Sequence, residues 1–371
     1  MASVVEGRAS TAAYRRDRRL ERRLYAPYIQ ERLDRGEWRL QTVPARIAGL
    51  RRDIEVFRAP RRTNLITHKW HGDSWTFCPP VWWDLAIGSG PCGMGCRACF
   101  LMLTFRTMRD PLRHVLYDNV DEIDGAVARW LLAPRRRSRH VMGVGVDRSD
   151  SLLYEGATGH VRALAPLFAD RRTNPSGAKL LLLTKTANVH HLDGLPTDNV
   201  VVSFSVNPQV LADLWEGKYP DSGEAICPSV EARLAAGVEA QQMGFEVRLR
   251  VDPMLTPPGW EGEYEALFAG VADSGLRPSV VTLGMYRQKN GQLDKWRDKW
   301  GLPPVEWDAP VSPAREGSHC RVSEESRCAA YGKCLGVIRR YLPDSRVGLC
   351  KETRTVRKTL GLQRAKCNCM A

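Results

Sequence analysis

The amino-acid sequence predicts an α/β fold in which helices cover a parallel sheet. Six short apolar runs alternate with helical segments between Val81 and Met285. Parallel strands need crossover connections, which helices usually supply, so this alternation favours a parallel sheet with its helices outside. A chain of 371 residues, 43% of them hydrophobic, is long enough for one large domain with additions or for two domains.

Each element is marked by its own residue pattern. The strands are expected at residues 81–87, 140–146, 179–184, 199–206, 246–251 and 278–285. The helices between them are expected at residues 159–170, 228–243 and 259–272. In folds of this kind the active site lies at the carboxyl ends of the strands, so the polar residues found there are the candidates for chemistry.

A glycine-rich loop directly after the first strand carries three cysteines. Cys92, Cys96 and Cys99 have C-x3-C-x2-C spacing. A structural zinc site closes with four ligands, and an electron-transfer [4Fe-4S] cluster usually takes four cysteines, so three thiolates leave one iron with an open position. The pattern is identified as that of the radical SAM superfamily, whose open iron binds S-adenosylmethionine. The alternative is a zinc loop or three unrelated buried thiols, since short cysteine motifs also match by chance.

Polar residues follow the later strands. The second to fourth strands end in Asp147, Ser149, Asp150, Lys185 and Ser205. Beside an iron-bound amino acid, a cation and several hydroxyl groups are what its carboxylate and ribose would need. Lys185 taken alone could also be a buried structural lysine.

The basic residues are concentrated at the two ends of the chain, whose total net charge is +13. Residues 1–63 hold 16 Arg and 8 acidic residues, and residues 312–371 hold 13 Lys or Arg and 5 acidic residues, so each end carries a net charge of +8. Clustered cations suit a polyanion such as DNA or RNA, although they could simply keep the protein in solution. Arg135–Arg139 is a further basic run that could bind phosphates.

The changes in charge and composition along the chain divide it into three regions. Residues 1–80 are expected to form a basic helical extension with helices near 14–40 and 47–57, residues 81–290 the catalytic core, and residues 291–371 a basic, cysteine-rich segment. Four tryptophans are expected to pack the extension against the core, with stacking on nucleic-acid bases as the alternative: Trp70, Trp75, Trp82 and Trp83.

The eleven cysteines indicate metal binding or reactive thiols, given that no apolar signal region or membrane span is present. A cytoplasmic protein is therefore expected, in the host cytoplasm if a phage encodes it. Six of the cysteines lie in the last segment and could hold a second iron–sulfur cluster or zinc, or be buried thiols: Cys320, Cys328, Cys334, Cys350, Cys367 and Cys369.

Five segments resemble spore photoproduct lyase and its relatives: residues 149–159, 183–192, 204–207, 228–236 and 257–264. The resemblance spans roughly residues 80–290. It implies a partial (βα)6 TIM-like barrel of the radical SAM type, a [4Fe-4S] cluster, S-adenosylmethionine, an electron donor such as flavodoxin or ferredoxin, and a thymine-derived substrate in DNA. It also places Ser149, Asp150, Lys185 and Ser205 at cofactor-binding positions.

Three positions depart from the family pattern. In the lyases a cysteine two residues before the Ser-Asp pair returns a hydrogen atom to the product radical, and tyrosines flank the third cluster cysteine. The corresponding residues here are Asp147, Ala98 and Phe100. Neither a carboxylate nor an alanine or phenylalanine side chain can replace a thiol or a phenol as hydrogen donor, so the repair relay is missing.

An isomerase does not need that relay, because its product radical can recover hydrogen from 5′-deoxyadenosine. The resemblance therefore favours an enzyme of phage DNA hypermodification, which rearranges an amino acid on the thymine methyl carbon from an N-linked to a C-linked form. Asp147 is then the candidate for substrate contact, for instance with an amino group. The alternatives are repair of thymine dimers with another hydrogen donor, and a catalytically silent, zinc-bearing nucleic-acid-binding protein.

Overall fold

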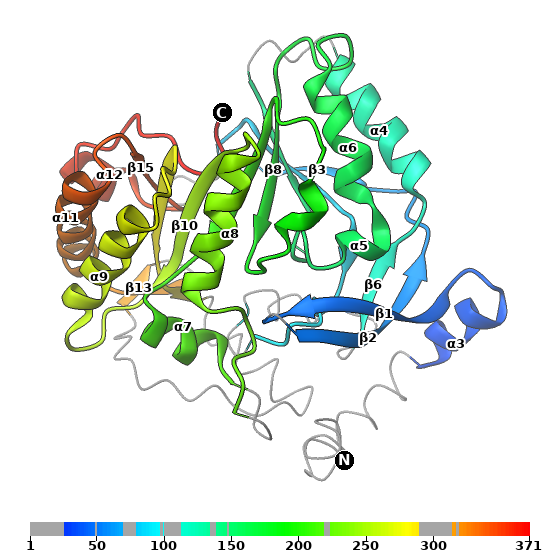
Figure 1. The fold of residues 1–371 in the computed structure, drawn as a ribbon, viewed down its shortest axis with the longest axis horizontal. Helices are drawn as coiled ribbons and strands as arrows, with labels where there is room; N and C mark the ends of the chain where they lie inside the picture. The colour runs from blue at the N-terminus through cyan, green and yellow to red at the C-terminus, as the bar shows by residue number, and fades with distance from the viewer. Residues whose placement is uncertain are drawn as a thin grey trace.

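The computed structural model describes residues 26–48, 50–69, 79–96, 99, 113–133, 139–146, 148–218, 223–288, 314–316 and 319–371. Its main feature is an eight-stranded sheet with the order β15-β11-β10-β9-β8-β7-β4-β3 (Figure 1). The six predicted strands are all present, as β4 (Trp82–Leu85), β7 (Val141–Val144), β8 (Lys179–Thr184), β9 (Val200–Ser205), β10 (Glu246–Met254) and β11 (Val280–Met285). They pair in parallel with one another, which confirms the predicted parallel sheet.

Two further strands form the edges of this sheet. β15 (Arg346–Leu349) adds in parallel to β11, and β3 (Ile66–His68) adds antiparallel to β4. Among the described strands nothing joins β15 to β3, so the sheet is curved but open. This is the partial barrel that the sequence predicts.

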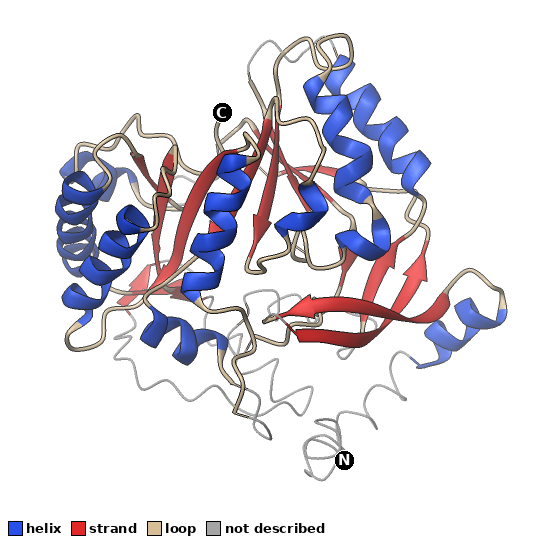
Figure 2. Ribbon diagram, in the orientation of Figure 1, coloured by secondary structure: helices blue, strands red, loops and turns tan. Residues whose placement is uncertain are grey.

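The strands alternate between two buried faces. Leu180 and Leu182 of β8 join the main core, whereas Leu181 and Leu183 face Trp82 on the opposite side of the sheet. Gly143 leaves room for Trp82, since a Cβ there would lie 2.2 Å from the indole ring. Helices cover the outer face (Figure 2): α4 (Val120–Leu132), α6 (His160–Ala169), α8 (Val230–Gln242), α9 (Trp260–Asp273) and α11 (Glu324–Tyr341).

The connections contain several short elements. They are α5 (Glu155–Thr158), the 3-10 helix η2 (Val189–Leu192), α7 (Gln209–Glu216), α12 (Arg354–Thr359), and a three-stranded sheet of β12 (Arg287–Gln288), β14 (His319–Arg321) and β13 (Ala314–Glu316). Two of the outer helices begin with a serine cap: Ser229 accepts from Ala232 N before α8, and Ser323 accepts from Ser326 N before α11. No helix among the described residues is long and apolar enough to cross a bilayer.

The N-terminal region corrects one expectation. Residues 47–57 were predicted as a helix, but β1 (Arg39–Ile47) and β2 (Leu50–Ala59) form an antiparallel hairpin. Val43, Ala45 and Ile47 are buried while the residues between them are exposed, which is the period of a strand rather than of a helix. Within the predicted helix at 14–40, the described part is helical only in α3 (Ala26–Asp34).

The hairpin is joined to the core by two further strands. β6 (His114–Tyr117) pairs in parallel with β2, and β5 (Gly88–Ser89) pairs antiparallel with β6. β5 leads directly into the cysteine loop, so the N-terminal region supports the predicted site. Trp82 is buried and Trp83 packs edge-on against Trp130, whereas Trp70 and Trp75 lie outside the described residues.

The last residues of the chain fold onto the concave face of the sheet. Asn368 N donates to Thr282 Oγ1 (2.8 Å), and Asn368 Nδ2 donates to Ser203 Oγ (2.9 Å). Arg248 Nη1 donates to the carbonyl oxygens of Asn368 and Met370, both at 2.7 Å. These contacts hold residues 366–371 inside the curve of the sheet.

Candidate active site at the carboxyl ends of the strands

The cysteine loop has a backbone that depends on glycine. Gly93 and Gly95 have φ values of +83° and +81°, in the left-handed region that other residues rarely adopt. A Cβ on Gly93 would lie 2.3 Å from Tyr154 Oη. That hydroxyl donates to the carbonyl oxygen of Cys92 (2.9 Å), and the Tyr154 ring stacks on His114 with centroids 5.4 Å apart. The loop is therefore held against β6 and the residues before α5.

The three cysteines of the loop gather in one small core beneath the hairpin. Cys96 is buried, and Cys92 and Cys99 pack against the same cluster. Burial raises the pKa of the Cys92 thiol well above its usual value, and the nearby thiols of Cys99 and Cys96 raise it further. The three thiols are thus close enough to interact electrostatically.

These three thiols are the ligand type that a [4Fe-4S] cluster needs. In the part of the chain that the structure describes, no three His, Cys, Asp or Glu side chains form a group that could hold one metal ion. A cubane binds each thiolate at a different iron, so its ligands stand further apart than the ligands of one zinc. Three neighbouring thiols in one core are compatible with a [4Fe-4S] cluster.

A fourth thiol, Cys227, lies beside the triad. Its Sγ is 3.4 Å from Cys96 Sγ, and both side chains are buried. The hydrogen bond from Cys227 lowers the pKa of Cys96 despite burial, while burial raises the pKa of Cys227 well above its usual value. Sequence reasoning missed this residue, because Cys227 is 131 positions away from Cys96 and belongs to no cysteine motif.

Lys185 follows β8 and belongs to a buried group of charges. Its Nζ lies 2.7 Å from Glu216 Oε1, and Arg233 binds both oxygens of the same carboxylate. Arg233 also donates to the carbonyl oxygen of Ser205 (2.9 Å), so the ends of β8 and β9 are tied together. Burial opposes ionisation of Glu216, but Lys185 and Arg233 outweigh it and lower its pKa to about 2.

This group contains an excess cation. Glu216 neutralises one of the two cations, and Arg233 is further satisfied by the carbonyl oxygens of Ser205 and Pro228. Lys185 has three N–H donors, and Glu216 is its only hydrogen-bond acceptor among the described residues. An anion arriving at this site would therefore meet the ammonium group of Lys185. Nothing in the sequence pattern pointed to Glu216 or Arg233.

Ser149 and Asp150 have different environments, although they are adjacent. The Ser149 hydroxyl is buried and has no hydrogen-bond partner among the described residues, which marks a place where a ligand could supply one. The Asp150 carboxylate instead accepts from Leu152 N, Leu153 N, Thr184 Oγ1 and Lys185 N at 2.7–3.0 Å. Asp150 therefore joins the ends of β7 and β8, which positions Lys185.

Some predicted site residues cannot be placed. Asp147, Ala98 and Phe100 lie outside the described residues, as do Arg135–Ser138. Ser205 ends β9 and is buried, next to Arg250 of β10 in the strand register. The four predicted cofactor-binding residues all follow or end neighbouring strands, as the sequence predicts. They are Ser149, Asp150, Lys185 and Ser205.

The C-terminal cysteines do not form a metal centre in the described part of the chain. Cys328 and Cys334 belong to α11, on the outside of the sheet, whereas Cys350 follows β15 and Cys367 and Cys369 lie on the concave face. The side chain of Cys320 is outside the described residues. The second metal site that the sequence suggested therefore has no support here.

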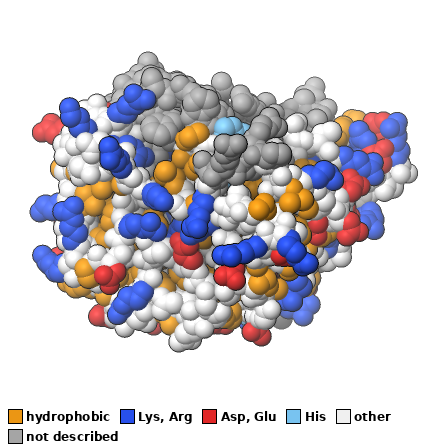
Figure 3. All heavy atoms as spheres, turned by 90° about the horizontal axis from the view of Figure 1, so that it is seen from above, with side chains coloured by type: hydrophobic (Ala, Val, Ile, Leu, Met, Phe, Trp, Pro, Cys, Tyr) orange, Lys and Arg blue, Asp and Glu red, His pale blue; other side chains and the backbone are white. Residues whose placement is uncertain are grey.

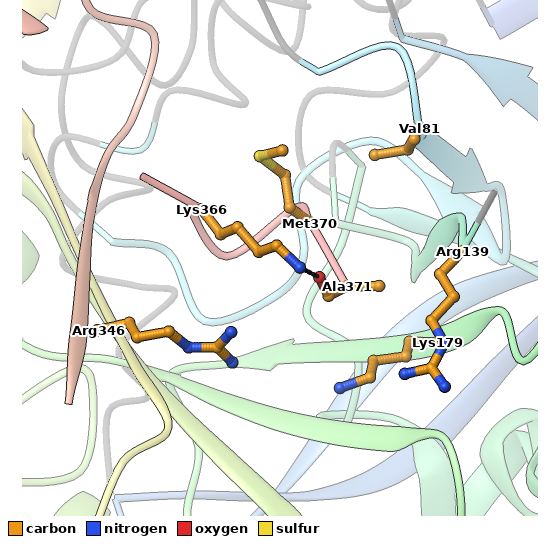
Figure 4. Close-up of a pocket in the computed structure, with 7 residues that line it drawn as sticks. All are labelled: Val81, Arg139, Lys179, Arg346, Lys366, Met370 and Ala371. Atoms are coloured by element: carbon orange, nitrogen blue, oxygen red, sulfur yellow. Dashed lines mark hydrogen bonds between the residues drawn. The ribbon is translucent and has the colours of Figure 1, made fainter. Parts of the chain in front are cut away.

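A cavity of about 330 Å³ lies at the opposite, amino ends of the strands. It is lined by Val81, Arg139, Lys179, Arg346, Lys366, Met370 and Ala371 (Figure 4). Four of these side chains are basic, and Lys and Arg side chains are also spread over the face of the molecule that Figure 3 shows. The cavity is separate from the cysteine loop, because Arg139, Lys179 and Arg346 precede or begin their strands.

Comparison with solved structures identifies the fold. A double mutant of spore photoproduct lyase with bound AdoMet and dinucleoside spore photoproduct superposes with a TM-score of 0.61 at 20% identity, covering 78% of this chain and 80% of that one. Spore photoproduct lyase complexed with dinucleoside spore photoproduct gives a TM-score of 0.60 at 21% identity, with the same coverage. No protein-family model matches the sequence, and no curated protein matches it either. The chain therefore has a fold similar to that of spore photoproduct lyase.

Proposed function

We propose that this chain is a radical SAM enzyme that acts on a thymine-derived base in DNA. The observation that carries the proposal is the meeting of three thiols, an excess lysine cation and an unpartnered buried hydroxyl at the carboxyl ends of the strands. The fold is similar to that of a lyase whose solved structures contain AdoMet and a dinucleoside lesion. The proposal follows from this combination rather than from the fold alone.

Each side chain has a role in this proposal. Cys92, Cys96 and Cys99 would hold a [4Fe-4S] cluster, and Lys185 and the Ser149 hydroxyl would bind polar groups of S-adenosylmethionine. When bound, the cluster and this cofactor supply an electron and a 5′-deoxyadenosyl radical. Asp150 and Glu216 hold Lys185 in place by the contacts described above.

Within this class we infer an isomerase, which converts an amino acid on the thymine methyl carbon from an N-linked to a C-linked form. The support is the residue at position 147, where the lyases carry a cysteine and this chain carries aspartate. A carboxylate has no weak bond to hydrogen that it could give to a carbon radical, but it can bind a substrate amino group. A rearrangement that returns hydrogen from 5′-deoxyadenosine does not need the missing thiol.

DNA is the proposed partner, with the basic ends of the chain as its clamps. Residues 1–63 and 312–371 each carry a net charge of +8, which suits phosphate contacts that set position rather than sequence. Chemistry on a base carbon also requires the nucleotide to leave the stack. A flavodoxin or ferredoxin is the proposed source of electrons.

Repair of a thymine dimer is the second candidate, and one observation favours it. Two thiols outside the triad lie near the predicted site, namely Cys227 beside Cys96 and Cys350 at the end of β15. Either thiol could give a hydrogen atom to a product radical and so replace the missing cysteine.

The test is anaerobic turnover of the cluster-reconstituted enzyme with dithionite and S-adenosylmethionine. DNA carrying a 5-aminoacyl-methyl pyrimidine should be rearranged without stoichiometric build-up of 5′-deoxyadenosine. Reversal of the thymine dimer alone would instead identify a lyase, and Cys227→Ala and Cys350→Ala would then locate its donor. Zinc without iron or acid-labile sulfide in the purified protein would overturn the enzyme assignment.

A further inference from the structure

A second group of charges lies on the same edge of the sheet as Lys185. Arg250 and Arg287 both bind the carboxylate of Asp252, with Arg250 Nη2 at 2.7 Å and Arg287 Nη2 at 3.0 Å from Oδ2. The side chains of Arg250 and Arg287 are 16% and 18% exposed, whereas that of Asp252 is 6% exposed. The two guanidinium groups therefore reach solvent to a small extent, and their shared carboxylate lies beneath.

The strand register places this group beside the predicted cofactor site. Arg250 of β10 is paired with Ser205 of β9, and residues paired between parallel strands point to the same face. Arg248, two residues earlier, binds the C-terminal tail on the concave face, so Arg250 and Asp252 continue the same inner row. Gly284 of β11 makes room for Asp252, because a Cβ there would lie 2.7 Å from the carboxylate carbon.

The guanidinium and carboxylate charges of this group do not balance. Burial opposes ionisation of Asp252, but Arg287 and Arg250 lower its pKa far below the usual value, so it contributes one negative charge against two positive ones. The Cys369 hydrogen bond lowers the pKa of Cys367 to about 6 against the effect of burial, and Arg357 and Arg250 help. Arg250 therefore also faces the Cys367 thiol, as Arg357 does.

The two arginines also have hydrogen-bonding capacity left over. Both donate to Cys350 Sγ, at 3.7 Å from Arg250 Nη2 and 3.5 Å from Arg287 Nη2, and sulfur is a weak acceptor. Arg250 Nη1 and Arg287 Nε have no acceptor among the described residues. A partly buried cation with unused donors is stabilised by an anion, and a guanidinium fork matches a carboxylate or a phosphate.

We propose that Arg250 and Arg287 form a subsite that binds an anionic group of the substrate, either the carboxylate of an amino-acid substituent on the base or a nucleotide phosphate. The placement of this subsite next to the reacting base rests on the proposed function. Lys185 would then serve the cofactor, and the two arginines would serve the substrate. Asp252 holds the guanidinium groups of Arg250 and Arg287 in position. Its negative charge also limits how strongly an anion binds to them.

The experiment measures equilibrium binding of two probe pairs to the cluster-loaded enzyme with S-adenosylmethionine, without reductant. One pair is 5-(carboxymethylaminomethyl)-2′-deoxyuridine and its methylaminomethyl analogue, which lacks the carboxylate. The other pair is thymidine 5′-monophosphate and thymidine. We expect the anion in one pair to tighten binding at least about tenfold, as a charged hydrogen-bonded pair does, and Arg287→Gln to abolish that preference.

The pair that shows the effect identifies the source of the anion. Arg277→Gln is the matched control, since Arg277 is an exposed arginine before β11 whose side chain donates only to the main-chain carbonyl groups of Ala272 and Leu276. Asp252→Asn removes the competing carboxylate and should tighten binding of the anionic probe, which a merely structural arginine cluster would not do. The proposal is overturned if Arg287→Gln leaves both preferences intact, or if it weakens neutral and anionic probes equally.

Failure of this subsite can be told apart from failure of the proposed function. Reductive cleavage of S-adenosylmethionine is measured in the same preparations without nucleoside. If the wild type cleaves S-adenosylmethionine and Arg287→Gln keeps the probe preferences of the wild type, the subsite is rejected but the proposed function is not. If cluster-loaded wild type does not cleave the cofactor, the radical SAM assignment itself fails.

Discussion

Cys96 Sγ lies 3.4 Å from Cys227 Sγ, although the two residues are 131 positions apart in the sequence. Two thiolates on one tetrahedral zinc stand about 3.8 Å apart, given Zn–S bonds of about 2.3 Å, whereas thiolates on different irons of a cubane stand further apart. The contact therefore raises the question of whether Cys227 is a fourth ligand of the proposed cluster or only a thiol beside it. The separation of 3.4 Å is shorter than either ligand spacing, which favours a neighbouring thiol.

We predict that Cys227→Ser keeps the cluster. Because three cysteines suffice for a cluster with an open iron, the variant should retain about four irons per chain, while Cys96→Ser should lose most of them. Iron and sulfide analysis after anaerobic reconstitution checks this, with the buried thiol variant Cys334→Ser as control. Loss of iron in Cys227→Ser to the level of Cys96→Ser would make Cys227 a fourth ligand and remove the open position.

A second metal site at the C-terminal cysteines is not expected. The double variant Cys367→Ser with Cys369→Ser should show the same iron content per chain as the wild type, because no metal-holding group exists there among the described residues. Iron and sulfide analysis after anaerobic reconstitution checks this prediction. A fall to half the wild-type iron would reveal a second cluster.

Lys185 is predicted to control affinity for S-adenosylmethionine. Lys185→Met should weaken binding by about 10- to 100-fold, corresponding to the roughly 1.5–3 kcal/mol of a hydrogen bond to a charged group, without loss of iron. Lys218→Met is the control, since that lysine is exposed and 3.9 Å from Asp213. Equal affinities of Lys185→Met and Lys218→Met would exclude a role for Lys185 in binding the cofactor.

Glu216 predicts a specific dependence of stability on pH. Its pKa is about 2 in the folded protein, below its ordinary value of 4.5, so the unfolded chain binds more protons between these values. The resulting stabilisation is fully present above about pH 4.5 and is lost as the pH falls towards 2. A shift of this size corresponds to about 3 kcal/mol.

Glu216→Gln should accordingly be less stable than the wild type at pH 7, and the difference should shrink as the pH falls below 4.5. Urea unfolding of the cluster-free chains between pH 3 and pH 7 measures it. Glu265→Gln changes only a surface group, namely an exposed pair with Arg340 and a hydrogen bond from Tyr341 Oη, and should show no such trend. A pH-independent difference for Glu216→Gln would contradict the assignment.

The C-terminal tail is predicted to stabilise the concave face. A Cβ on Gly348 would lie 2.3 Å from the Lys366 carbonyl oxygen, so Gly348→Ala should displace residues 366–371 and cost at least about 1–3 kcal/mol, as overpacking does. Gly336→Ala in α11 is the matched control, because it meets nothing within 4 Å and gains helix propensity. Thermal unfolding and proteolysis of the tail compare the two variants. Equal stabilities would show that the tail does not pack as described.

The N-terminal hairpin shows why part of the fold was misjudged from sequence. Residues 47–57 hold four charged residues among apolar ones, and they were predicted to be part of a basic helical extension. The alternation of buried Val43, Ala45 and Ile47 with exposed neighbours has the period of a strand. Pairing of β2 with β6, more than fifty residues later, is a tertiary event that local patterns do not contain.

Local chemistry was enough to predict the parallel strands, the cysteine loop and the polar residues at the strand ends. Apolar runs, glycines and cysteine spacing are properties of neighbouring residues, so the sequence alone contains them. Only the tertiary structure brought Cys227 to Cys96, Glu216 and Arg233 to Lys185, and Arg287 to Asp252. These pairs come from different loops and strands that meet at one edge of the sheet, and burial there makes each unbalanced charge energetically significant.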